Sequence, residues 1–346
     1  MPTHLVTSAL AGSLLAGKPS VDELVARTSR TLGRSWRWLR PLAQRYVKAF
    51  SNGVRPRHRD VVQFLSQDAG FLRALDKYAD KIRIEQWLNP PHSMQPVSAA
   101  GTWPVPAIET IGDLADWLAV TPNELDWSAD LKALGYKGPS TRLRHYSYRI
   151  LRKSSGAIRL IEAPKGRLKE MQRQILSQIL DKIPPHPAAH GFIKGRSIKT
   201  FTTPHLAQTV VLRMDLSDFF PSFCGARIQT IFRTIGYPET VADLLGGICT
   251  NAVPRDVWKD SPPSLDPLIL QEARGLYARP HLPQGAPTSP ALANIGTYRG
   301  RLPPHRARPY RRSHLYTIRR RSCFLRRGAL RRERGALLRP RGRHSH

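Results

Sequence analysis

An aspartate that directly follows a short apolar run is the first residue here whose type and position could do chemistry. The run is residues 209–214, which are predicted to form a buried strand, and Asp215 comes at its end. A carboxylate in such a place is costly to keep ionised unless it is paired or holds a cation. Asp215 is therefore interpreted as a cation ligand, with a helix cap or a loop aspartate as the alternative.

A second segment about 70 residues later combines turn formers with small polar residues. Residues 281–294 read His-Leu-Pro-Gln-Gly-Ala-Pro-Thr-Ser-Pro-Ala-Leu-Ala-Asn. Its Pro and Gly content predicts a turn that leads into a helix, with Ser289 as the cap and Pro290 in the first turn. Taken alone, this segment indicates local structure and no particular chemistry.

Strands and helices alternate on either side of Asp215, and these elements must position both segments. Residues 148–161 are predicted to form two strands around a Ser-Ser-Gly turn. Residues 168–183 have the apolar spacing of an amphipathic helix, and residues 228–235 and 238–249 are predicted to form two more. This alternation indicates an α/β or α+β layer.

The remainder of the chain differs in character from this layer. Residues 1–85 are predicted to be helical, a Pro-rich stretch follows, and Thr121-Pro-Asn-Glu124 has the pattern of a capping box. After Ile295 the periodicity ends, and we expect neither an amphipathic helix nor a strand there. The expected division is a helical N-terminal region (1–88), a linker (89–106), a short helical unit (107–140), the mixed layer (141–295) and a disordered basic tail (296–346).

The net charge of +30 indicates a polyanionic partner such as nucleic acid. Residues 296–346 carry +16 of it, from 17 arginines and Glu333, and they contain no lysine. The three cysteines, Cys224, Cys249 and Cys323, lack the spacing of a zinc site and suit a reducing cytosol. No apolar run is long enough to span a membrane, and the N-terminus is at most a weak signal peptide.

Five segments, taken together and in order, resemble the reverse transcriptases, and the retron group in particular. The resemblance covers roughly residues 145–295. The segments are Lys153…Gly156…Arg159-Leu-Ile…Pro164; Leu168-Lys…Gln172…Ile175-Leu; His190-Gly-Phe…Gly195-Arg196-Ser-Ile; Val-Leu-Arg-Met-Asp215-Leu-Ser-Asp-Phe-Phe-Pro-Ser; and Leu-Pro-Gln284-Gly-Ala-Pro-Thr-Ser-Pro. The resemblance implies an α+β fold with the fingers and an incomplete palm of a right-hand polymerase, without a thumb.

The resemblance also implies roles for matching residues. Asp215 and the carbonyl of Leu216 would hold the two Mg²⁺ ions that activate the primer 3′-hydroxyl and bind the dNTP triphosphate. Lys153 and Arg159 would contact that triphosphate, and a solvated hairpin is their alternative. The other implied roles are exclusion of a ribose 2′-hydroxyl by Phe220 (or simply core packing), nucleotide binding by Gln284 and Gly285, and template RNA binding by Arg196 and His205.

The sequence departs from the retron pattern at two places. Before the first catalytic strand, the retron enzymes carry Asn-Ala-x-x-His, and here only His205 matches. The family's Tyr-x-Asp-Asp hairpin is absent, since no aspartate follows Asp266. Because Asp215 alone cannot hold two divalent cations against their mutual repulsion, we expect this polypeptide not to polymerise.

A shift of reading frame near residue 299 accounts for the missing hairpin. With Ile318 as ATA, Arg319 as CGC, Arg320 and Arg321 as CGA and Ser322 as TCT, reading one base later gives Tyr-Ala-Asp-Asp-Leu. The same shift turns residues 303–309 into Arg-Leu-Thr-Gly-Leu-Ala-Arg, which also resembles the family. The alternative is a true basic tail that binds RNA.

The leading interpretation is an RNA-directed DNA polymerase that makes cDNA on a structured RNA in the cytosol. Its implied partners are that RNA, the RNA/DNA duplex and a retron effector protein, in the setting of antiviral defence. The alternatives are a non-catalytic nucleic-acid-binding remnant and a reverse transcriptase of another lineage, such as an intron maturase or a phage-defence enzyme.

Overall fold

The structure is a computed structural model in which the chain separates into two compact units. Unit 1 comprises Met1–Trp103, Ala107–Leu125 and Phe232–Leu245, and unit 2 comprises Pro104–Pro106, Asp126–Ile231 and Gly246–His346. The residues that the structure describes are 2–51, 54–88, 93–131, 144–153, 158–208, 211–214, 216–262, 265–299 and 323–325.

The described residues of the N-terminal part of unit 1 form five helices, in line with the helical prediction for residues 1–85. Side-chain caps fix where two of them begin, because Ser20 accepts a hydrogen bond from the amide of Glu23 and Asp68 accepts one from the amide of Phe71. The helices are α1 (Thr3–Leu15), α2 (Val21–Thr31), α3 (Leu39–Ala49), α4 (His58–Gln67) and α5 (Ala69–Lys77).

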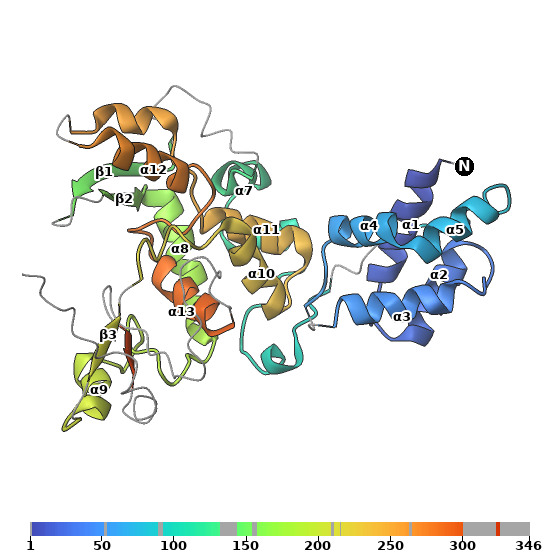
Figure 1. The fold of residues 1–346 in the computed structure, drawn as a ribbon, viewed down its shortest axis with the longest axis horizontal. Helices are drawn as coiled ribbons and strands as arrows, with labels where there is room; N and C mark the ends of the chain where they lie inside the picture. The colour runs from blue at the N-terminus through green and yellow to red at the C-terminus, as the bar shows by residue number, and fades with distance from the viewer. Residues whose placement is uncertain are drawn as a thin grey trace, which may run out of the picture. The chain divides into compact units, whose positions relative to one another are not determined.

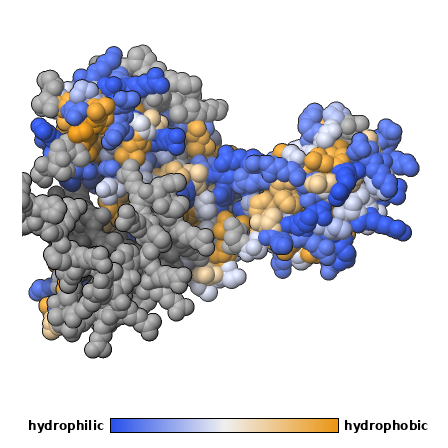
Figure 2. Space-filling model, in the orientation of Figure 1, coloured by the Kyte–Doolittle hydropathy of each residue, from blue (hydrophilic) through white to orange (hydrophobic). Residues whose placement is uncertain are grey.

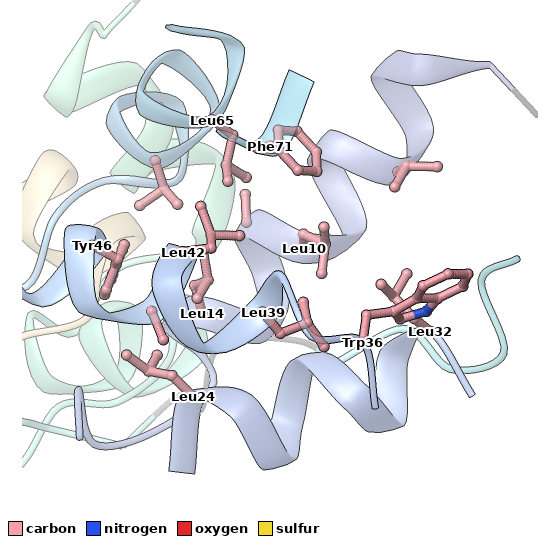
Figure 3. Close-up of a cluster of buried hydrophobic side chains, with 14 of the residues drawn as sticks. Leu10, Leu14, Leu24, Leu32, Trp36, Leu39, Leu42, Tyr46, Leu65 and Phe71 are labelled. Atoms are coloured by element: carbon pink, nitrogen blue, oxygen red, sulfur yellow. The ribbon is translucent and has the colours of Figure 1, made fainter. Parts of the chain in front are cut away.

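The apolar faces of these helices meet in one core (Figure 3). Leu10 and Leu14 from α1, Leu42 from α3, Leu65 from α4 and Phe71 from α5 are at most 1% exposed. Burial of this kind is worth roughly 1.5–3 kcal/mol for each large side chain. The buried residues of this core all lie between Val6 and Ile82.

Residues distant in sequence also belong to unit 1. The guanidinium of Arg57 pairs with Asp243 at 2.7 Å, and the amide of His58 donates to Glu239 Oε2 at 3.0 Å. Both acids lie on α11 (Glu239–Ile248). The clustering of residues 232–245 with the N-terminal helices follows from such contacts, which sequence patterns do not reveal.

Two short helices follow in unit 1, the second of which runs into unit 2. They are α6 (Ile111–Trp117) and α7 (Pro122–Ala129). The predicted capping box is confirmed, because the amide of Thr121 donates to Glu124 Oε2 at 2.8 Å and the amide of Glu124 donates to Thr121 Oγ1 at 3.2 Å.

Unit 2 contains the hairpin that the sequence predicts. Strands β1 (Tyr146–Arg152) and β2 (Ile158–Pro164) pair antiparallel, with Arg149 opposite Ile161 and Leu151 opposite Arg159. The other described elements of unit 2 are α8 (Gly166–Gln178), α9 (Ile198–Thr202), β3 (Leu212–Met214), α12 (Pro267–Tyr277), α13 (Ser289–Arg299), β4 (Cys323–Leu325) and the short 3₁₀ turns η3 (Leu180–Lys182), η4 (Thr203–His205) and η5 (Arg255–Asp260). The helix α10 (Gly225–Ile235) runs from unit 2 into unit 1, and the turn η1 (Ser98–Ala100) lies in unit 1.

One face of the hairpin packs into a second core. Ile158 and Leu160 from β2 pack with Trp258 from η5 and Tyr277 from α12. Figure 1 shows α12 alongside the hairpin. Because side chains alternate across a strand, this packing leaves the other face of the hairpin for polar contacts.

Three local expectations need correction. The helix predicted for residues 168–183 ends at Gln178 and gives way to the turn η3. The helix after the Gly-Ala-Pro-Thr turn begins at Ser289, so Ser289 is not its cap; its hydroxyl donates instead to the carbonyl of Pro283 at 2.7 Å. Residues 323–325 form β4, paired antiparallel with β3, although the three apolar residues Cys-Phe-Leu are too short a run to predict a strand.

The described residues form a helix-rich α+β structure with two small antiparallel sheets. Within them, no helix is both long and apolar enough to cross a bilayer. Hydrophilic residues cover much of the visible face of α2–α5 (Figure 2), as expected for helices that turn their apolar sides inward.

Candidate nucleotide-binding site

The β1–β2 hairpin places two predicted phosphate contacts on one face. Arg159 lies opposite Leu151 in the antiparallel register, and directly paired residues share a face. Lys153 follows the last residue of β1, and the alternation of the strand puts it on the same face as Leu151. Both cations are half-buried. The hairpin therefore presents two positive charges on the face opposite to the packed core.

Lys153 contacts the segment that follows Asp215. Its Nζ lies 3.5 Å from Asp218 Oδ1, and both side chains are about one-third exposed, at 30% and 29%. Asp218 has a φ of +50°, which is an unusual backbone conformation for a residue other than glycine. It begins a turn in which the carbonyl of Asp218 accepts a hydrogen bond from the amide of Ser222 at 3.0 Å. Lys153 at the end of the hairpin and Asp218 thus lie side by side, although 65 residues separate them in the sequence.

Phe220 lies in the turn that Asp218 begins. Its carbonyl accepts a hydrogen bond from the amide of Phe223 at 3.1 Å, and its ring is 5.6 Å from that of Phe219. Phe223 is buried, whereas Phe220 is only half-buried. Phe220 is therefore not a fully packed core residue, and part of its ring remains available for contact.

Gln284 and Gly285 form a turn against β2. The amide of Glu162 donates to the carbonyl of Gln284 at 3.0 Å. Gly285 has a φ of +141°, and a Cβ atom at this position would lie 2.8 Å from the carbonyl oxygen of Glu162. Only glycine fits both the conformation and the space. The turn is held at β2 by main-chain contacts, and Gly285 itself is exposed.

Three polar residues beneath this turn were missed by the sequence reasoning: Glu162, Asn251 and His281. Glu162 and His281 are 0% and 1% exposed, and they form an ion pair at 3.0 Å. A signal for Glu162 is present in the sequence, because the alternation of β2 places it on the same face as Ile158 and Leu160. An acid in phase with buried apolar residues requires a partner.

The predicted template contacts Arg196 and His205 lie together around α9. Arg196 Nη1 donates to the carbonyls of His186, Pro187 and Ala189, so its guanidinium holds the preceding loop in shape. The ring of His205 lies 5.2 Å from that of Phe201. The loop reaches α13, where the side-chain amide of Asn294 donates to the carbonyl of Gly191 at 2.8 Å.

The metal site that the resemblance implies is not assembled from the described residues. Asp215 and residues 318–321 lie outside them, while Leu216 is described and half-buried. Across the part of the chain that the structure describes, no three His, Cys, Asp or Glu side chains come together as a metal site. The carboxylate of Asp218 faces Lys153 instead. These residues by themselves do not fit a two-cation centre.

Known proteins nevertheless share much of this sequence. No family model matches the chain. The retron Mx65 reverse transcriptase of Myxococcus xanthus is 42% identical over 156 residues, which are 45% of this chain and 34% of that protein. The retron Mx162 reverse transcriptase of the same organism is 34% identical over 226 residues, 65% of this chain and 42% of that protein. The retron Ec86 reverse transcriptase of Escherichia coli is 33% identical over 138 residues, 40% of this chain and 35% of that protein.

By sequence, the chain is similar to the retron reverse transcriptases over as much as 65% of its length. It spans less than half the length of the three retron reverse transcriptases named above. A match over 65% of the chain necessarily includes its middle, and so takes in the β1–β2 hairpin and Asp218. The described contact between Lys153 and Asp218 therefore lies within sequence shared with a retron reverse transcriptase.

Proposed function

We propose that this chain supplies the nucleotide-binding and template-binding part of an RNA-directed DNA polymerase of the retron type, with the fingers and part of the palm of that fold in residues 141–295. The observation that carries the proposal is the convergence of three separate segments. Lys153 at the end of β1 contacts Asp218, and Glu162 on β2 holds the carbonyl of Gln284. Residues from three motifs of the family thereby surround one hairpin.

In this proposal Lys153 and Arg159 neutralise the triphosphate of an incoming dNTP. Phosphoryl transfer builds negative charge on phosphate oxygens, and fixed cations stabilise that charge without reorganising. Arg159 offers a planar fork of donors and Lys153 a mobile point charge, so the pair can follow a phosphate chain. Lys153 would exchange Asp218 for phosphate when a nucleotide binds.

The remaining residues shape the pocket. The exposed Gly285 allows close approach of the nucleotide to the backbone, and Phe220 is proposed to exclude a ribose 2′-hydroxyl with the free part of its ring. Asp215 and the carbonyl of Leu216 are the proposed contribution of this chain to a Mg²⁺ site, which supplies charge neutralisation when occupied. The loop held by Arg196, with His205, is proposed to contact a structured RNA template.

Binding of dATP tests the proposed site without requiring turnover. We expect the double variant Lys153→Ala/Arg159→Ala to raise the Kd for dATP at least about tenfold, because each charge-assisted hydrogen bond to phosphate is worth roughly 1.5–3 kcal/mol. Isothermal titration measures this directly. Arg173→Ala, which removes an exposed charge from α8, is the matched control and is expected to stay within about twofold. Equal Kd values for the double variant and the wild type would exclude the hairpin as the triphosphate site.

A further inference from the structure

Four polar side chains form a buried network beneath the Gln284–Gly285 turn. The network consists of Tyr148 on β1, Glu162 on β2, and Asn251 and His281 from the segments that flank η5 and α12. Glu162 Oε1 lies 3.0 Å from His281 Nε2. Asn251 Nδ2 donates to Glu162 Oε2 at 2.7 Å and lies 3.1 Å from the hydroxyl of Tyr148. None of these groups has a role in the proposed contacts to the nucleotide.

The partners of His281 define its protonation state. Its Nδ1 lies 2.7 Å from the carbonyl oxygen of Arg279, and its Nε2 faces the carboxylate of Glu162. With Glu162 ionised, both partners are acceptors, so each ring nitrogen donates and the ring is an imidazolium. Burial alone would lower the pKa of His281, but the charge of Glu162 and the hydrogen bonds to Glu162 and Arg279 outweigh burial and raise it.

The network is connected to the turn through the same residues. The amide of His281 donates to the carbonyl of Asn251, and the amide of Asn251 donates to the carbonyl of His281, both at 3.0 Å. Three residues later, the carbonyl of Gln284 accepts from the amide of Glu162. Glu162 thus binds His281, which precedes the turn, with its side chain, and it binds Gln284 in the turn with its main chain.

We propose that the Glu162–His281 ion pair, oriented by Asn251, holds the Gln284–Gly285 turn at the position along β2 that nucleotide binding requires. The inference rests on the proposed nucleotide site at this turn. Glu162, Asn251 and His281 are positioning residues, because they act on the nucleotide only through the turn. A buried ion pair is a weak source of stability, but its directional hydrogen bonds fix one register between two segments.

The groups that surround the pair allow its dependence on pH to be stated. Tyr277 packs its ring edge on His281 at 5.1 Å, Tyr148 reaches Glu162 through Asn251, and Cys224 pairs with His281 through the backbone. Burial raises the pKa of both tyrosines, which keeps them neutral near pH 7. The contribution of the ion pair to the stability of the folded state is present in full below pH ~6.5, the ordinary pKa of histidine. It is lost as the pH rises through the raised pKa of His281.

Two substitutions of Glu162 separate the positioning role from simple burial. Glu162→Ala removes both hydrogen bonds, so dATP is expected to bind at least about tenfold more weakly. Glu162→Gln keeps them, because the amide nitrogen can donate to Nε2 of a neutral His281 while the amide oxygen accepts from Asn251. Glu162→Gln is therefore expected to bind dATP within about threefold of the wild type, and its Kd should lack the rise that the wild-type Kd shows as the pH passes through the raised pKa of His281.

The experiment combines dATP titration with hydrogen exchange of the peptide covering residues 281–289. For Glu162→Ala we expect faster exchange in this peptide and a higher Kd with an unchanged binding stoichiometry. Asp68→Ala, which breaks the Arg45–Asp68 pair in unit 1, is the control for general destabilisation. It should change neither the hydrogen exchange of residues 281–289 nor the Kd for dATP. If Glu162→Ala instead lowers the stoichiometry at constant Kd, or changes exchange without changing Kd, the pair is merely structural and the inference is overturned.

The same titration separates this inference from the proposed function. A wild-type chain that fails to bind dATP overturns the nucleotide site, and with it the role assigned to the pair. A wild-type chain that binds dATP, together with a Glu162→Ala variant that binds it equally well, overturns only the positioning role.

Discussion

No template-directed cDNA is expected from this chain, whereas the same gene read one base later from about codon 299 is expected to yield an active enzyme. The difference should be at least about 10³-fold in primer extension with Mg²⁺ and dNTPs, because loss of a catalytic group typically costs this much or more. The chain contains no aspartate after Asp266. With the codons proposed above, the shifted frame would supply Tyr-Ala-Asp-Asp at residues 318–321, which would complete the carboxylates around Asp215.

The control for this comparison is Asp215→Asn in the shifted frame, which should abolish extension and so exclude a contaminating polymerase. Two results would contradict the account. cDNA made by the unshifted chain would show that the second carboxylate pair is dispensable or is supplied elsewhere. An inactive product from the shifted gene would favour the alternative that residues 296–346 are a true basic tail.

Gly285→Ala is expected to cost roughly 2–4 kcal/mol of unfolding free energy and at least about tenfold in dATP affinity. At a φ of +141° the backbone is strained for any L side chain, and the added Cβ would lie 2.8 Å from the carbonyl of Glu162. Relief requires the turn to move away from β2. That movement breaks the hydrogen bond between the Glu162 amide and the Gln284 carbonyl.

Gly275→Ala is the matched control for this substitution. Gly275 lies inside α12, and an added Cβ there meets no atom within 4 Å. The same chemical change should therefore stabilise the protein by roughly 0.5–1 kcal/mol, because glycine is a poor helix former. Urea unfolding measures both variants. Equal effects of the two substitutions would show that the turn at Gly285 is not constrained as described.

Local structure in this chain follows closely from its sequence. The capping box at Thr121 and the two strands predicted within residues 148–161 are set by neighbouring residues, and both predictions are confirmed. The Ser-Ser-Gly turn between the strands lies outside the described residues. The cap at Ser289 was predicted wrongly, because a long-range partner, the Pro283 carbonyl, takes its hydroxyl. Strand β4 was missed because three residues give no periodicity, and pairing with β3 defines it.

The candidate site depends on contacts between distant segments, and sequence predicts these less well. The motifs placed Lys153, Gln284 and Gly285 in one site by resemblance alone, and the contacts Lys153–Asp218 and Glu162–Gln284 give that grouping a geometry. The Glu162–His281 pair spans 119 residues, so no local pattern links its members. The alternation of β2 marks Glu162 as buried, but only the fold identifies its partner.

Photolabelling with an azido analogue of dATP tests the central claim most directly, because it maps where the nucleotide binds. After irradiation, digestion and mass spectrometry, labelled peptides are expected from the hairpin, residues 146–164, and from the turn, residues 281–289, with unlabelled dATP competing for both. Labelling confined to the N-terminal helices, residues 2–88, would contradict the assignment of the nucleotide site to the hairpin and the turn.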